Sequence, residues 1–287
     1  MAKLASIIAG LREHGSAWFM RGIAVLILAF LFFVAIGGIS QNDKWKITRV
    51  EVIGTQTVDS DTVEALVREK LKGNYYIAYA RENSQIFPRH EIEEGLLNVF
   101  PRLASAHVER IDAHTISVKV SERKPYVLWC GEVFSSNIRE LANCFFVDNT
   151  GFVFDRAPLF SEGVYLEVYG GLEGMQNESA LRAHISPAQF ALLYATTKAL
   201  IQDIGEPVRI VLKPEGEINI TIEKSAPFPM LAGVELRLKD STSAETITKN
   251  LLAALPVQFP ADTIQKKKLL YIDMRFGNKI FFGFENE

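Results

Sequence analysis

Two groups of residues have types and spacing that could do chemistry, and each has a simpler explanation. Asp148-Asn149-Thr150-Gly151 is close to the Asp-Thr-Gly triplet that supplies a catalytic carboxylate, but an asparagine interrupts it and no second copy exists. We therefore expect a β-turn there. His107 and His114 have no cysteine or carboxylate beside them at metal-ligand spacing. Surface histidines are expected rather than a metal site.

Other motifs of catalysis or phosphate binding are absent from the sequence. It contains no Walker loop, no GxGxxG, no nucleophile elbow and no HExxH. Its carboxylates are numerous but form no distinctive pair. We therefore expect a protein that is not an enzyme, with no catalytic residue, no cofactor, no metal and no small-molecule substrate.

The two cysteines, Cys130 and Cys144, bracket a short segment whose flanks both have the composition of strands. Cysteines at the facing ends of two paired strands could form a disulfide. Closing a loop of about 15 residues would stabilise the fold by about 3 kcal/mol. Such a bond would persist only in an oxidising compartment. Two buried free thiols remain the alternative.

An apolar run from Gly22 to Ile39 contains no charged or polar side chain. As a helix it would be about 27 Å long, close to the thickness of a bilayer's hydrocarbon core. A cleaved signal peptide is the alternative, because small residues follow the run, but signal h-regions are shorter. We expect a retained transmembrane helix over 21–39 after a short tail over 1–20. Positive charges on the two sides nearly balance, so charge alone does not give the orientation.

The composition is that of an ordinary folded protein. Hydrophobic residues make up 48% of the chain and charged residues 23%, and no stretch has low complexity. The formal net charge is −3, and the part after the apolar run is slightly more acidic than the whole. An acidic body argues against a nucleic-acid partner.

The first part after the apolar run has a clear rhythm of strands and helices. Alternation predicts a strand at 47–53, and Asp59 or Ser60 can cap a helix that ends near Gly73. A second helix follows Pro88, and two strands are expected at 104–110 and 115–121. The order strand, helix, helix, strand, strand predicts a small sheet with both helices on one face.

The remainder is rich in strands, with one helix opening at Pro187 and another around 244–255, ahead of Pro256. A closing hairpin is expected from strands at 269–276 and 279–284, with Gly277-Asn278 as the turn. The whole chain is therefore predicted to be α+β, with a largely antiparallel second sheet and helices packed on it.

Several segments together resemble the FtsQ/DivIB family of cell-division proteins. The resemblance rests on ITRVEVIGTQTV, FPRLASAHVERIDAHTISVKVSERKPYVLW, CFFVDNTGFVF and LLYIDMRFGNKIFFGF, with Ile272, Asp273 and Arg275 in place in the last one. Leu103 and Asp112-Ala113 depart from the usual pattern. The resemblance implies a linker at 40–46, a POTRA domain (polypeptide-transport-associated) at 47–124 and a C-terminal β-domain at 125–287.

The resemblance also implies a function. Proteins of this family are bitopic scaffolds of the inner membrane, with the amino terminus in the cytoplasm and the body in the periplasm, enriched at the division septum. Their partners are the small membrane proteins FtsB and FtsL, and they help control septal peptidoglycan synthesis. The alternative is a POTRA-bearing accessory of polypeptide transport or outer-membrane assembly.

The final strand is the candidate binding site. If it lies at a sheet edge, its unpaired N–H and C=O groups can accept a strand from another chain. Alternation puts Ile280, Phe282 and Phe284 on one face and Lys279, Phe281 and Gly283 on the other. A core role explains the first face well but not Phe281. The resemblance implies that a segment of FtsB adds a strand here.

Overall fold

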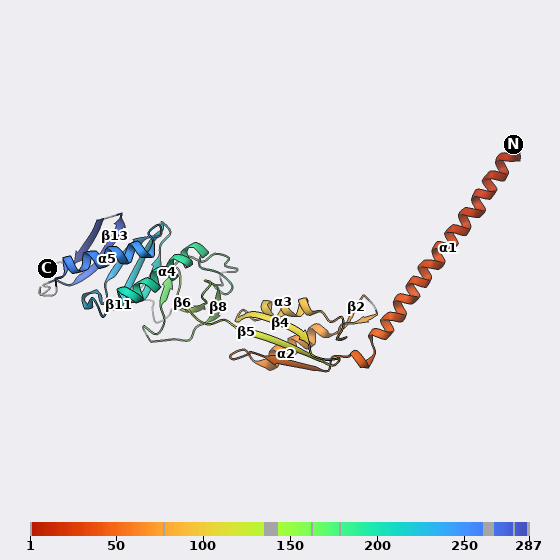
Figure 1. The fold of residues 1–287 in the computed structure, drawn as a ribbon, viewed down its shortest axis with the longest axis horizontal. Helices are drawn as coiled ribbons and strands as arrows, with labels where there is room; N and C mark the ends of the chain where they lie inside the picture. Colours follow the sequence, from red (N-terminus) through yellow and green to blue (C-terminus); the bar gives the residue numbers. More distant parts are fainter. Residues whose placement is uncertain are drawn as a thin grey trace. The chain divides into compact units, whose positions relative to one another are not determined.

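The computed structural model describes residues 2–76, 78–134, 143–161, 163–177, 179–260, 267–277 and 279–285, with side chains from Met20 onward. Within these residues the fold is mixed α+β, with five α-helices, a small sheet and a large, mostly antiparallel sheet (Figure 1). The chain divides into two compact units, residues 1–122 and residues 123–287.

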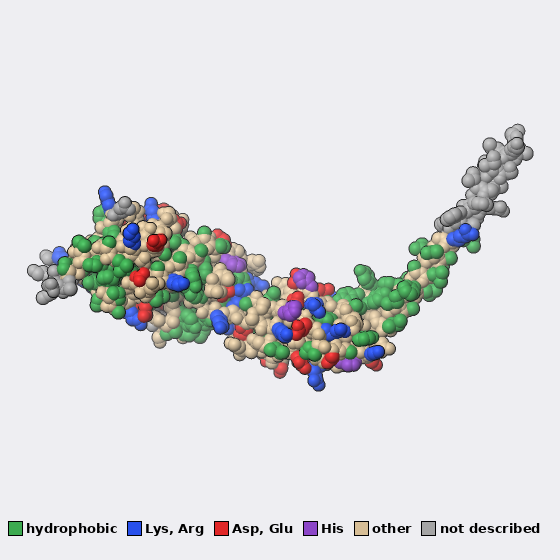
Figure 2. Space-filling model, viewed as in Figure 1, with side chains coloured by type: hydrophobic (Ala, Val, Ile, Leu, Met, Phe, Trp, Pro, Cys, Tyr) green, Lys and Arg blue, Asp and Glu red, His purple; other side chains and the backbone are tan. Residues whose placement is uncertain are grey.

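The first unit begins with one long helix, α1 (Ala2–Ser40). Its segment Met20–Ser40 has a mean hydropathy of 2.8, and it is long and apolar enough to cross a membrane by length and composition. Only 6% of the apolar window is buried, and its hydrophobic side chains cover the exposed part of the helix (Figure 2). An apolar surface exposed on all sides is what a lipid-facing helix presents.

The folded part of the first unit has the predicted order of strand, helix, helix, strand, strand. Its sheet has the order β1-β5-β4, with β1 parallel to β5 and β4 antiparallel to it. The elements are β1 (Arg49–Ile53), α2 (Ser60–Leu71), α3 (Arg89–Val99), β4 (Leu103–Arg110) and β5 (Thr115–Glu122). Asp59 is the N-cap of α2 and accepts hydrogen bonds from two backbone N–H groups of its first turn. Val63, Val67, Ile92 and Leu96 of the two helices pack on the sheet.

Two features before α3 are absent from the prediction. A short 3-10 helix, η1 (Asp43–Trp45), follows α1, and a two-stranded hairpin joins α2 to α3. The hairpin consists of β2 (Asn74–Tyr75) and β3 (Tyr79–Ala80), in antiparallel register. Strands of two residues carry no measurable alternation, so the sequence pattern gives no signal for them.

The second unit is built on a nine-stranded sheet with the order β14-β13-β12-β11-β10-β9-β6-β7-β8 among the described residues. Five of its neighbouring pairs are antiparallel and three are parallel. The strands are β6 (Val127–Trp129), β7 (Phe145–Val147), β8 (Val153–Arg156), β9 (Glu167–Tyr169), β10 (Glu206–Leu212), β11 (Glu217–Lys224), β12 (Glu235–Lys239), β13 (Leu269–Phe276) and β14 (Lys279–Phe284).

Two helices, α4 (Pro187–Asp203) and α5 (Ala244–Gln258), pack against each other and against the sheet. A short 3-10 helix, η3 (Pro229–Leu231), lies between β11 and β12. The expectation that α5 stops before Pro256 is wrong, because the helix runs on to Gln258 with the proline inside it. Proline removes one hydrogen bond of the helix, but the burial of Leu255 and Phe259 on either side outweighs that loss.

Candidate functional site

The last two described strands form an antiparallel hairpin at one end of the large sheet. Ile272 of β13 lies opposite Phe282 of β14, and Asp273 lies opposite Phe281. Gly277 turns the chain with φ +66°, while Asn278, the other expected turn residue, lies outside the described residues. Because β14 is the terminal strand in the sheet order, one of its two sides has no strand beside it in the part of the chain described.

The two faces of β14 differ as alternation predicts. Ile280, Phe282 and Phe284 pack against the core under α5, and Phe259 contacts Phe282 with ring centroids 5.5 Å apart. On the opposite face Phe281 is 50% exposed, and its ring makes a T-shaped contact with that of Phe276, with centroids 5.5 Å apart. An exposed phenylalanine on a terminal strand gains little from folding, which is the pattern of a binding residue.

Gly283 lies on the same outer face as Phe281. A glycine is needed at this position because the ring of Tyr271 leaves no room for a side chain. Tyr271 of β13 lies over Gly283, so a Cβ placed there would meet the tyrosine ring at 2.2 Å. The guanidinium of Arg237 also lies over the Tyr271 ring, with its Cζ 3.8 Å from the ring centroid. The glycine thus lets an aromatic ring cover the strand at a position without a side chain.

A network of charged side chains holds β13, the strand that pairs with β14, in place. Arg275 donates to both carboxylate oxygens of Asp273, at 2.9 and 2.6 Å, and to Glu217 of β11 at 2.7 Å. The hydrogen bonds from Arg275 hold the pKa of Asp273 below its usual value, against the opposing effect of burial. Asp273 and Arg275, which carry part of the family resemblance, therefore support the strand rather than face a ligand.

The two edge strands of the large sheet, β8 and β14, differ in whether other backbone pairs with their outer side in the described part of the chain. At the β8 end, the loop at 182–185 covers the strand: Val153 N–H donates to Ala183 O at 2.9 Å, and Arg182 N–H donates to Val153 O at 2.8 Å. At the β14 end no such pairing is present among the described residues. Natural sheets cover or charge their edges against unwanted pairing, so an open, apolar terminal strand indicates a place for a partner.

A groove lies beside β14 and has a volume of about 410 Å³. One wall is a stripe of α5 at helical spacing, and the other is the inner face of the strand; the lining residues are Asn250, Ala253, Ala254, Val257, Gln258, Ile280 and Phe282. Because two of the α5 residues are alanines, the helix leaves space next to the strand. A strand added to β14 would point every second side chain into this groove. Sequence reasoning missed the groove, although the small residues at this spacing were visible.

The two cysteines meet at the other end of the sheet. β6 pairs with β7 in antiparallel register, and Trp129 lies opposite Phe145. A disulfide of 2.02 Å joins Cys130 to Cys144, the residues that continue this pair. Of the two possibilities that the sequence left open, bond or free thiols, the structure has the bond.

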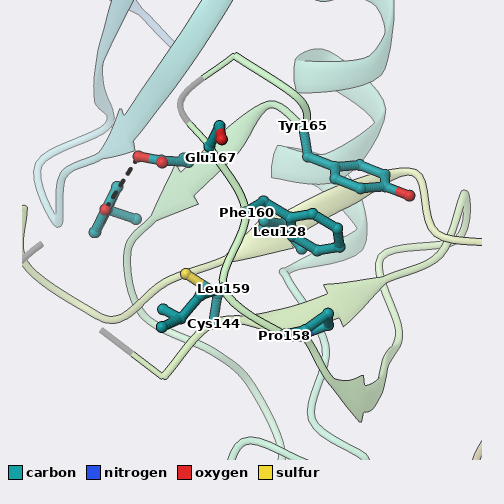
Figure 3. Close-up of a pocket in the computed structure, with 9 residues that line it drawn as sticks. Leu128, Cys144, Pro158, Leu159, Phe160, Tyr165 and Glu167 are labelled. Carbon is teal, nitrogen blue, oxygen red and sulfur yellow. Dashed lines mark hydrogen bonds between the residues drawn. The ribbon is translucent and has the colours of Figure 1, made fainter. Parts of the chain in front are cut away.

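A small cavity of about 60 Å³ lies next to Cys144 (Figure 3). Leu128, Phe160 and Tyr165 are among the residues that line it, and the rings of Phe160 and Tyr165 have centroids 5.0 Å apart. Glu167 is the acidic group there, and it accepts a hydrogen bond from Tyr169 at 3.2 Å. The cavity is far smaller than the usual ligand pocket of about 300 Å³ or more, so we assign it to packing under the 158–165 segment.

Asp148 lies in a tight turn, as expected, and is almost fully buried. Its Oδ1 accepts from the backbone N–H and the hydroxyl of Thr150, and its Oδ2 accepts from Arg123 at 2.5 Å. Burial alone would raise the pKa of Asp148, but these hydrogen bonds outweigh it and hold the pKa below its usual value. The carboxylate is saturated with donors, so its role is to hold the turn.

We predict that Asp148→Asn lowers the free energy of unfolding of the second unit by about 2 kcal/mol at pH 7. Since the folded-state pKa is depressed, the carboxylate stabilises above its unfolded pKa near 4, and this contribution is lost as the pH falls through the folded value. Wild type should therefore converge on the variant in acid. Urea unfolding followed at Trp129, with Trp18 and Trp45 replaced by Phe, measures this. Glu215→Gln, at an exposed carboxylate, should change little.

The two histidines lie apart in the first unit. His107 is on β4, with Nδ1 3.3 Å from Glu93 Oε1, and His114 in the β4–β5 turn contacts the carbonyl of Lys46 at 3.0 Å. No group of three or more His, Cys, Asp or Glu side chains that could hold a metal ion is present in the described part of the chain.

In a comparison with known proteins, no protein-family model and no curated protein matches this chain.

Proposed function

We propose that this chain is a cell-division scaffold of the FtsQ/DivIB kind, held in the inner membrane by α1. In this proposal the amino terminus is cytoplasmic, both folded units are periplasmic, and the protein is enriched at the division septum. Residues 47–124, which contain the folded part of the first unit, form a POTRA domain. The second binds FtsB or FtsL by accepting a strand at β14, and the complex helps control septal peptidoglycan synthesis. The protein acts by binding and performs no chemistry of its own.

The observation that carries this proposal is the edge of β14, which has no strand beside it in the described part of the chain, together with the adjacent groove. Main-chain hydrogen bonds to β14 would supply affinity, and apolar side chains entering the groove would supply specificity. The fitting partner is therefore an extended segment whose alternate residues are apolar. A partner tethered to the same membrane is already concentrated near the site, so modest contacts suffice.

Three other features support the proposal. The order of β1, α2, α3, β4 and β5 is that expected of a POTRA domain. A single apolar helix precedes it and suits a bitopic protein. The Cys130–Cys144 disulfide suits an oxidising compartment and thus a periplasmic body.

Site-specific photocrosslinking in the organism that makes this chain tests the proposal. A crosslinker at position 281 should capture a single-span division protein, identified by mass spectrometry, while one at position 201 should not. Ile201 is a matched control because it is 56% exposed in the same unit but lies on α4. Depletion of the chain should block septum formation and leave filaments. Capture of an outer-membrane barrel or of exported polypeptides, with normal septa, would replace the proposal with the transport alternative.

A further inference from the structure

The β2–β3 hairpin of the first unit lies against the apolar segment of α1. Phe33 of α1 contacts the rings of Tyr79 and Tyr76, at centroid distances of 4.9 and 6.5 Å. The Tyr79 hydroxyl donates to the carbonyl of Phe33 at 3.3 Å. Hydrophobic side chains continue from α1 onto the adjoining part of this unit (Figure 2). The hairpin therefore reaches a residue well inside the segment that can span a membrane.

Gly37 makes this close approach possible. It is the buried residue of the apolar segment, and a Cβ built on it would lie 2.2 Å from the Cβ of Ala78. Any larger residue at position 37 must push the hairpin away from the helix. The contact is thus specific to a glycine one turn before the end of α1.

Polar groups fix the hairpin to the end of the helix. Ser40 accepts from the backbone N–H of Ala80 at 3.0 Å through its hydroxyl, and from the Asn83 amide at 2.8 Å through its carbonyl. Gln41 donates to the carbonyl of Ala78 at 3.1 Å. Ser40 and Gln41, at the start of the segment expected as a linker, are therefore hydrogen-bonded to the hairpin and to Asn83 just after it, and these bonds fix the position of the hairpin along α1.

Tyr76, at the tip of the hairpin, has a strained backbone conformation although its side chain is mostly exposed to solvent. Its φ is +55°, in the left-handed region that bulky residues avoid, and it is 89% exposed. Left-handed backbone at a residue with a Cβ costs roughly 1 kcal/mol or more. Its ring meets that of Phe33 at a long centroid distance of 6.5 Å. A strained and exposed aromatic residue indicates a site that is completed by something outside the chain.

The position of the Phe33 contact along α1 indicates that the membrane lipid completes this site. The segment Met20–Ser40 is about 31 Å long as a helix, which matches the hydrocarbon core, so its end lies near the core's boundary. Phe33 precedes Ile39 by about 9 Å, and helical side chains lean further toward the amino terminus. When α1 spans a bilayer, the hairpin tip therefore lies at the depth of the upper acyl chains and headgroups.

We propose that the β2–β3 hairpin inserts Tyr76 and Tyr79 into the lipid–water interface of the membrane that α1 spans. The inference rests on the membrane anchoring in the proposed function. Insertion of about 5–10 Å is the depth typical of interfacial segments. Tyrosine suits this depth, because its ring enters the apolar layer while its hydroxyl meets the headgroups. The folded part of the first unit is then held against the membrane instead of moving freely on a linker.

Spin labelling of the full-length chain in phosphatidylcholine vesicles tests this inference. The two native cysteines are bonded to each other, so Tyr76→Cys supplies a unique free thiol. The nitroxide at position 76 should have a several-fold higher ratio of oxygen accessibility to nickel-complex accessibility than one at position 53. Ile53 is the matched control, since it is 52% exposed at the far end of β1. Adding Gly37→Leu should lower the ratio at position 76 to that of position 53.

Carbonate extraction separates the two levels of the proposal. If the chain resists carbonate but the label at position 76 is as exposed to nickel as that at position 53, the hairpin insertion is wrong and the anchor stands. If carbonate removes the chain from the vesicles, the anchor fails and the insertion fails with it. Protection of position 76 only at high protein-to-lipid ratio would mean that a second copy covers the hairpin, which overturns the lipid assignment.

Discussion

Phe281→Asp is expected to weaken capture of the proposed FtsB-type partner by about 30-fold or more. Phe281 is half exposed on the terminal strand, where an added strand would cover it. Truncating a central aromatic contact costs about 2 kcal/mol or more, which corresponds to this factor. A carboxylate adds the cost of burying a charge at the interface. Titration of the full-length protein in nanodiscs with the partner's extramembrane segment measures the change in Kd.

The same measurement contains its controls. Ile201→Asp introduces the same charge at an equally exposed apolar site and should leave the Kd unchanged. Ala254→Trp should fill the groove and weaken binding, whereas Leu252→Trp, on an exposed part of α5 outside the lining, should not. Equal affinity for wild type, Phe281→Asp and Ala254→Trp would show that the partner binds elsewhere.

Reduction of the Cys130–Cys144 disulfide is expected to lower the free energy of unfolding of the second unit by about 3 kcal/mol, a factor of about 150 in its unfolding equilibrium. The bond closes a loop with a sequence separation of 14, and its loss frees that loop in the unfolded chain. The double variant Cys130→Ala, Cys144→Ala should match the reduced wild type. Alanine is preferred because Cys130 is buried and serine would bury a hydroxyl.

Hydrogen exchange of the full-length chain, with and without reductant, measures this loss of stability, and the first unit serves as an internal control. Amides of β6, β7 and β8 should lose protection by up to the same factor on reduction, because exchange through global opening tracks the unfolding equilibrium. The first unit contains no cysteine, so its amides should not respond. Unchanged protection in the second unit would show that the bond adds no stability there.

Much of the fold was predictable because it follows local periodicity. The apolar run predicted a helix over 21–39, which is the second half of α1 (Ala2–Ser40), and the alternation of 115–121 predicted β5, which the structure places at Thr115–Glu122. Asp59 was one of two expected caps and is the N-cap of α2. Helical spacing after Pro187 gave α4. In each case a single element carries its own signal.

The unpredicted features depend on tertiary contacts. The β2–β3 hairpin is too short to show a period and exists because Tyr79 and Ala80 bond to α1. The passage of α5 beyond Pro256 depends on the burial of Phe259. The sequence identified Phe281 as the residue that a core role explains poorly. It could not place β14 at the sheet end or reveal the groove, since both depend on the position of α5 and on the order of strands.

The position of β14 in the sheet has a consequence for how the protein is made. This strand follows every other described strand in the chain, and it pairs only with β13, which joins β12 through the crossover that contains α5. The edge therefore comes into being only after the earlier strands have been synthesised and assembled. A partner that pairs with this edge would therefore select molecules in which the earlier strands of the sheet have already assembled, so binding would depend on folding of the second unit.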